Sequence, residues 1–280
     1  MLARLLHLDR RFIFAFIALA VVAAFLFPVT LPTEPSAPVR AVYQAMEKLP
    51  PGSILLFSFD YGPSTAVECH PMAVTAVRQA LARNLRLVTM TLWAEGKPFV
   101  RLAEEQVLKE LKEQGITKTY GVDYVNLGFK TGGEPMLRSL ATGFAAQFPT
   151  DDTGRPLSDL PLMREVKGYR SFAMVHTYSA GRPGIVEWVR VVSSQYGVPV
   201  VGGVTAVQAP EVYPFLNSGQ LLGLLGGLRG AAEYEVLTGH PGTASRGMVA
   251  QSIVHFLIAG FIIFSNVVYF LDRRRTRRGQ

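Results

Sequence analysis

The sequence predicts a doubly wound α/β domain, with one mostly parallel sheet of about five strands, flanked by two transmembrane helices. Two observations predict this arrangement. Uncharged apolar stretches at residues 12–31 and 248–271 are each about 20 residues or more, which is enough to cross a bilayer. Between them, short apolar runs alternate with amphipathic segments, the pattern of parallel strands joined by helices. The single cysteine, Cys69, excludes an intrachain disulfide, so the domain must depend on its core.

Arginines next to both apolar stretches predict the orientation in the membrane. They are Arg4, Arg10 and Arg11 before the first stretch, and Arg273, Arg274, Arg275, Arg277 and Arg278 after the second. By the positive-inside rule, both termini are cytoplasmic and the centre of the chain lies outside the plasma membrane. An alternative for the first stretch is a cleaved signal peptide. No small-x-small cleavage site stands near Pro28 to Pro32, so an uncleaved anchor is favoured.

These features divide the chain into six parts and place it in the lipid bilayer. The parts are a tail (1–11), a span (12–31), a proline-rich linker with a short helix (32–50), an extracytoplasmic α/β domain (51–247), a second span (248–271) and a basic tail (272–280). The two tails carry +2 and +4 of the formal charge of +7. A nucleic-acid-binding protein carries its positive charge on the folded domain, so nucleic acid is not an expected partner.

Periodicity places the elements in order. A short helix should begin after an N-cap at Ser36 and end before Pro50. Strands are predicted over 54–59, 85–92, 124–129, 172–178 and 199–207. Helices are predicted over 71–83, 98–114, 134–148, 185–196 and, in a glycine-rich segment, within 213–237. The alternation resembles flavodoxin-like (Rossmann-like) and periplasmic-binding-protein folds, a likeness of fold that implies no function.

Polar residues and glycines at the strand ends are the candidate ligand-binding positions. Ligands bind beyond the carboxyl ends of parallel strands, near the reversal of strand order. The candidates are Asp60, Ser64, Lys130, Thr131, Gly132, Gly133, His176 and Arg182. Glycines before a helix suit an anion, but they also suit a tight turn, and the turn is the favoured interpretation. Asp60 either serves a ligand or caps the next turn.

Catalytic signatures are missing from the sequence. Cys69 and His70 are adjacent, so on a helix they point about 100° apart and cannot form a nucleophile–base pair. A buried structural cysteine is therefore favoured. No G-x-S-x-G, H-E-x-x-H or C-x-x-C motif is present, and we expect neither a metal site nor a cofactor. Asp151 and Asp152 are expected in a solvated turn.

Two patterns predict contacts with other helices or subunits. Gly219, Gly223 and Gly227 recur every four residues, which on a helix would form one smooth groove for a helix of the same domain or for another subunit. Gln251, His255 and Asn266 share one stripe of the second span. Such residues lie either in the interfacial layer or against another helix, from the first span or from a partner.

Three functional hypotheses follow. The favoured one is an assembly or interaction subunit of a membrane complex, as a homo-oligomer or with another membrane protein. The second is a receptor for a small anionic solute. The third is a membrane-bound hydrolase or transferase that uses Asp60, Ser64, Lys130 or His176; the sequence leans against an enzyme.

Overall fold

The structure is a computed structural model that describes residues 10–26 and 34–278. The chain divides into two compact units, which are considered separately. One unit, Thr33–Ala244, is the α/β domain. The other combines Met1–Pro32 with Ser245–Gln280 and contains α2 (Arg10–Leu26) and most of α13 (Thr243–Arg278).

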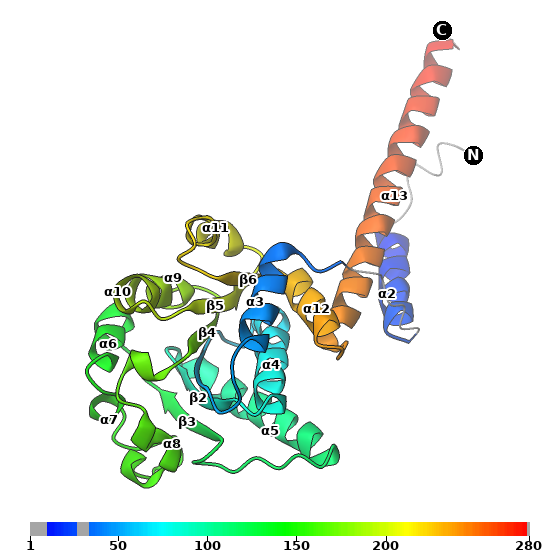
Figure 1. The fold of residues 1–280 in the computed structure, drawn as a ribbon. Coiled ribbons are helices and arrows are strands. Elements are labelled where there is room, and N and C mark those ends of the chain that lie inside the picture. The colour runs from blue at the N-terminus through cyan, green and yellow to red at the C-terminus, as the bar shows by residue number, and fades with distance from the viewer. Residues whose placement is uncertain (1–9, 27–33, 279–280) are drawn as a thin grey trace. The chain divides into compact units, whose positions relative to one another are not determined.

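The domain is built on a single parallel sheet of six strands, flanked by helices (Figure 1). The strands are β1 (Ile54–Asp60), β2 (Arg86–Thr91), β3 (Tyr124–Phe129), β4 (Met174–Ser179), β5 (Val200–Val204) and β6 (Gly223–Gly226). Their order is β3-β2-β1-β4-β5-β6, so the direction of winding reverses between β1 and β4. The predicted fold class is confirmed in its single parallel α/β sheet, with one strand more than expected.

β1 is buried along its whole length, as its continuous apolar run predicts for a strand covered on both faces. Successive side chains point to opposite faces. Leu56 belongs to the core cluster that includes Trp188 of α9, whereas Phe57 stacks on His176 on the other face. The core therefore fills both sides of the sheet.

Helices cover both faces (Figure 1). One face is covered by α3 (Ala37–Glu47), α4 (Ala66–Ala82), α5 (Lys97–Glu113) and α12 (Gly227–Leu237). The other face is covered by α6 (Gly133–Leu140), α7 (Phe144–Gln147), α8 (Pro161–Glu165), α9 (Ile185–Trp188), α10 (Ser194–Tyr196) and α11 (Ala209–Asn217). A π turn, Val189–Ser193, makes α9 and α10 continuous. Short 3₁₀ turns lie at Ala94–Gly96, Leu157–Asp159 and Tyr169–Ser171.

Several predicted boundaries were wrong. The helix predicted over 134–148 is interrupted between α6 and α7, where Gly143 has a φ of 152°. α4 begins five residues earlier than predicted, at Ala66 and ahead of Pro71, so the proline lies inside the helix rather than at its start. The strand predicted to extend to residue 207 ends at Val204.

The predicted glycine groove does not exist. Gly219 lies in a turn with a φ of 75°, Gly223 begins β6, and Gly227 has a φ of 61° at the start of α12. A Cβ on Gly223 would lie 2.7 Å from the backbone nitrogen of Val42 in α3. Gly223 thus allows β6 to approach the backbone of α3 within the domain. Because the three glycines lie in a turn, a strand and a helix start, their spacing of four residues does not form a helix surface.

One helix of the described residues is long and apolar enough to cross a membrane, by length and composition alone. It is Thr243–Leu271 of α13. α2 is apolar only over the shorter range Arg11–Ala24, so the described residues hold one candidate span rather than the predicted two. Residues 27–31 of the predicted first span, and the Pro28 to Pro32 segment weighed for cleavage, lie outside the described residues.

A pair of substitutions in β6 tests the close approach of α3. Gly223→Ala should lower the free energy of unfolding by roughly 1–3 kcal/mol, because the new methyl group overpacks against Val42 and the Pro38 carbonyl. Gly226→Ala is the control, since Gly226 has a φ of −102° and its Cβ would make an ordinary contact, 3.7 Å from that of Ala209. Denaturant unfolding of the detergent-solubilised chain measures both. Equal effects would contradict the assignment.

Candidate functional site

The carboxyl ends of β1 and β4 form the reversal point of the sheet, where a parallel α/β fold places its ligands. Asp60 ends β1 here, and its side chain is fully buried. Its carboxylate accepts hydrogen bonds from the Leu92 N–H (2.7 Å), the Ser58 hydroxyl (2.7 and 2.8 Å) and the Trp188 indole N–H (3.1 Å). Asp60 therefore joins the end of β2 to α9.

Burial changes the protonation of Asp60. Loss of solvent raises its pKa to about 7, although hydrogen bonds from Leu92, Ser58 and Trp188 act in the opposite direction. A carboxyl group with three sets of donors inside the protein is satisfied without a ligand. Asp60 therefore stabilises the packing of β1 against its neighbouring elements.

Trp93 spans the reversal point. It follows β2, and its indole N–H donates to the Pro183 carbonyl in the loop after β4 (2.7 Å). Its ring packs on Gly181, where an added Cβ would lie 3.3 Å from the ring. Because β1 lies between β2 and β4 in the sheet, Trp93 crosses the end of β1. The protein's own side chain occupies part of the space that ligands use in this fold class.

His176 is also internal. It lies within β4, fully buried, and stacks on Phe57 with ring centroids 4.6 Å apart and planes 4° apart. Its Nδ1 lies 3.2 Å from the Tyr178 hydroxyl, and its Nε2 has no hydrogen-bond partner among the described residues. Burial lowers its pKa to about 3, so the imidazole is neutral at physiological pH.

The loop after β3 shows the geometry of a tight turn. Gly132 and Gly133 have φ values of 130° and 53°, which a residue with a side chain rarely adopts. Thr131 is exposed, and the Lys130 ammonium lies over the Phe148 ring, 5.8 Å from its centroid. These features support the turn interpretation of the glycines.

The remaining two candidates lie elsewhere at this edge. Ser64 is exposed in the loop between β1 and α4. Arg182 makes an ion pair with Glu187 (2.9 Å). A Cβ on Gly133 would lie 3.8 Å from that of Pro183, so the loops after β3 and β4 adjoin. The structure thus brings together the loops of Lys130 and Arg182, but not Asp60, Ser64 and His176.

Cys69 and His70 do not form a reactive pair. The Cys69 thiol is buried, contacts the Ser179 carbonyl at 3.6 Å, and has its pKa raised by burial. A thiol in this state is a poor nucleophile. His70 instead lies 2.9 Å from the Tyr61 hydroxyl, and burial lowers its pKa to about 4. The cysteine is a core residue, as interpreted from the sequence.

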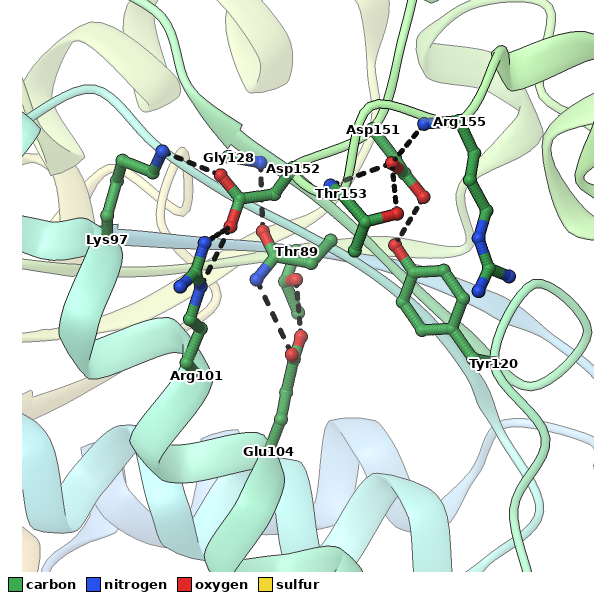
Figure 2. A network of polar contacts seen from close by, with 11 residues as sticks. Thr89, Lys97, Arg101, Glu104, Tyr120, Gly128, Asp151, Asp152, Thr153 and Arg155 are labelled. Carbon is green, nitrogen blue, oxygen red and sulfur yellow. Dashed lines mark hydrogen bonds and ion pairs between the residues drawn. The ribbon is translucent and has the colours of Figure 1, made fainter.

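A polar network beside β3 was missed by the sequence analysis (Figure 2). Asp152 makes ion pairs with Lys97 (2.7 Å) and Arg101 (2.5 Å), and its N–H donates to the Asn126 carbonyl. Burial raises the pKa of Asp152, but hydrogen bonds from the two cations outweigh it and hold the pKa below its usual value. The expected solvated turn is therefore wrong at Asp152, whose side chain is only 6% exposed.

Asp151 is buried in the same network (Figure 2). Its carboxylate accepts hydrogen bonds from the Tyr120 hydroxyl, from the N–H and hydroxyl of Thr153, and from the Arg155 N–H. β3 is an edge strand, whose free backbone groups need cover. The Asp151–Asp152 turn supplies that cover, and we interpret the network as structural.

Glu104 lies beneath this network (Figure 2). It is buried on α5 and accepts hydrogen bonds from Thr89 (2.7 Å) and, more weakly, Asn126 (3.4 Å). Burial raises its pKa to about 7. One sequence signal existed: Glu104 shares the apolar face of the helix with Val100 and Val107, where an acidic residue is unusual.

Two further buried carboxylates lie on α12. Glu233 accepts hydrogen bonds from the N–H (2.9 Å) and hydroxyl (2.6 Å) of Ser36 and pairs with Arg229. Ser36 precedes α3 as predicted, but its hydroxyl donates to Glu233 instead of capping the helix. Glu235 accepts from the N–H groups of Gly242 (2.8 Å) and Ala244 (3.0 Å).

These contacts attach both ends of the domain to one helix. Ser36 lies where the chain enters the domain, and Ala244 lies where it leaves. The Tyr234 hydroxyl, between the two glutamates in sequence, donates to Gln79 and fixes α12 to α4 (2.5 Å). We call Glu233, Glu235 and their partners the exit contacts.

Comparisons with known proteins give no family. No family model matches the chain, and no curated protein matches it. Among solved structures, it is similar to an alpha,alpha-trehalose-phosphate synthase (UDP-forming) from Burkholderia vietnamiensis, with 12% identity, a TM-score of 0.33, and coverage of 94% of this chain and 50% of that one. It is also similar to the glycotransferase of kitacinnamycin, with 17% identity, a TM-score of 0.25, and coverage of 74% and 44%. The chain spans about half the length of these structures, and scores this low carry no argument.

The described residues contain no group of three His, Cys, Asp or Glu side chains placed to hold a metal ion. The buried carboxylates Asp60, Glu104, Glu233 and Glu235 each bind donors of the protein instead.

Glu104 gives the domain a testable pH dependence. Its pKa in the folded state, about 7, exceeds the ordinary value of 4.5, so the folded state binds the proton more tightly. Its contribution to stability is therefore full below pH 4.5 and is lost as the pH rises through 7. Glu104→Gln should raise the free energy of unfolding at pH 8 by roughly 1–3 kcal/mol and flatten its pH dependence.

The measurement is denaturant unfolding of the full chain in detergent at pH 5 and pH 8. Glu105→Gln is the matched control, because Glu105 is exposed on the same helix. A Glu104→Gln protein as pH-dependent as the wild type would show that Glu104 does not carry the effect.

Proposed function

We propose that this chain is a membrane-anchored extracytoplasmic α/β domain that acts as an assembly or interaction subunit of a membrane complex. The exit contacts are the observation that carries the proposal. These contacts attach both ends of the domain to one helix, and in the proposal the chain is anchored in the membrane on either side of them. Such tethering raises the effective concentration of a domain against partners in the same membrane.

The state of the candidate ligand residues supports the same proposal. Asp60 is saturated by internal donors, His176 is enclosed within β4, and Arg182 is paired with Glu187. A hydrolase or transferase requires at least two such groups at one accessible point. That alternative therefore has the least support.

The proposed anchoring uses both apolar segments. α13 supplies one span, and the segment 12–31, which includes most of α2, supplies the other in the proposal. The arginines flanking them would place both termini in the cytoplasm of a plasma-membrane protein and the domain outside. The two helices contact each other through Phe16 and Phe261, whose rings pack edge to face 6.1 Å apart.

A receptor for a small anionic solute is the second candidate. One observation favours it: the loop of Lys130 and the amino end of α6 adjoin the loop of Arg182 through Gly133 and Pro183. A helix amino terminus with a lysine and an arginine nearby suits an anion. However, the Arg182 guanidinium is already paired with Glu187.

Native mass analysis after gentle detergent extraction tests the proposed function. The assembly role predicts a particle heavier than one chain, with stoichiometric copies of itself or another protein. A double variant, Lys130→Ala with Arg182→Ala, should leave that particle intact, because both side chains belong to the alternative site. A lone monomer in every detergent tried would contradict the assembly role.

The same double variant tests the solute receptor. Equilibrium binding of phosphate and of a dicarboxylate to the full chain should show no saturable site if the chain is an assembly subunit. Saturable binding that is lost in the double variant would instead establish the receptor.

A further inference from the structure

α13 carries a seven-residue repeat along one side. Residues at the first position of the repeat alternate with residues four places later along the same stripe. Helices that pack against each other along their length place their contact residues at this spacing. Met248, His255, Ile262 and Tyr269 hold the first position, and Ser252, Ala259 and Asn266 the second. We call these seven residues the heptad stripe.

The heptad stripe lies away from α2. α2 contacts the side of α13 that carries Phe261, through Phe16. At 100° per residue, Phe261 and Asn266 are about 140° apart around the helix, and Phe261 and His255 about 120°. The stripe comes nearest to α2 at Ile262 and Asn266, which border a hollow shared with Ile13.

Five of the seven residues of the stripe are exposed in the single chain. His255, Ala259 and Asn266 are exposed, as are Ile262 (57%) and Tyr269 (52%). A carboxamide in hydrocarbon without a hydrogen-bond partner is costly, and polar residues in membrane spans usually face protein. Ser252 and Ala259 are small, which lets a second helix come close. The composition is that of a packed interface rather than of a lipid-facing surface.

We propose that the heptad stripe is a self-association surface that takes the same stripe of a second copy of this chain. The proposal rests on the proposed membrane anchoring. All copies insert in one orientation, so two α13 helices pair in parallel and place Asn266 opposite Asn266. The carboxamide both donates and accepts hydrogen bonds, so it is complementary to itself. One polar residue in an otherwise apolar repeat also fixes the register of the pair.

Energy transfer between labelled full-length chains in phosphatidylcholine vesicles tests the pairing. Asn266→Leu should weaken dimerisation about tenfold, a loss typical of an interhelical hydrogen bond in membranes. Ser265→Leu is the matched control: it makes the same polar-to-leucine change on the adjacent residue, 100° away from Asn266. Dimerisation that both variants reduce equally, or that neither reduces, would overturn the role of the stripe.

Cysteine cross-linking gives a second readout that does not depend on removing a polar group. Ile262→Cys, on the stripe, should form an intermolecular disulfide under mild oxidation. Val267→Cys should not, although Val267 is 50% exposed and Ile262 57%, because it lies about 140° from Ile262. Cys69 is buried and is kept in both variants, so that they differ only in the position of the added cysteine. Equal cross-linking at both positions would overturn the proposal.

The outcomes separate this inference from the function on which it rests. A chain that is monomeric in vesicles but co-purifies with another membrane protein would overturn self-association and leave the assembly role standing. A chain that alkaline carbonate removes from native membranes would overturn both.

Discussion

The exit contacts on α12 attach the beginning and the end of the domain to one helix. Glu233 and Glu235 are two residues apart, so they point about 160° apart around the helix, and each reaches a different end of the domain. Both carboxylates are buried, which makes their N–H and hydroxyl donors necessary to them. The helix also packs against α3, α4 and β6. The two ends of the domain are therefore attached to one helix, which packs against the β6 edge of the sheet.

Side chains of the protein bridge the reversal point of the sheet. Asp60 ties β1 to the end of β2 and to α9, and Trp93 crosses from β2 to the loop after β4. Hydrogen bonds in a buried network hold each other in place, so this edge has a defined shape without a ligand. Asp60 and Trp93 hold the segments that follow β2 and β4 through these hydrogen bonds. The proposed interaction surface is the heptad stripe on α13.

The sequence predicted those elements whose structure depends on residues close together in the chain. The continuous apolar run of β1 and the boundaries of β3 could be predicted because burial on two faces leaves a simple signature in the sequence. β6 was missed because its Gly-Leu-Leu-Gly lies among glycines whose spacing imitates a helix, and because the need for Gly223 comes from Val42, far away in the chain. Asp152 was assigned to solvent because its partners, Lys97 and Arg101, are about fifty residues distant. Asp60 ends β1 as the sequence predicts, whereas His176 lies within β4, and the sequence does not reveal that Asp60 and Arg182 are bound by other groups of the protein.

Hydrogen exchange of the exit amides tests the constraint most directly. In the full chain, the amides of Ser36, Gly242 and Ala244 should be protected from exchange in the wild type. Glu233→Gln should release Ser36, and Glu235→Gln should release Gly242 and Ala244, because a carboxamide turns one of the two acceptor oxygens into a donor. Glu211→Gln, at an exposed position of α11, should change none of them. Unchanged protection in the Glu233 and Glu235 variants would contradict the account that α12 holds both ends of the domain.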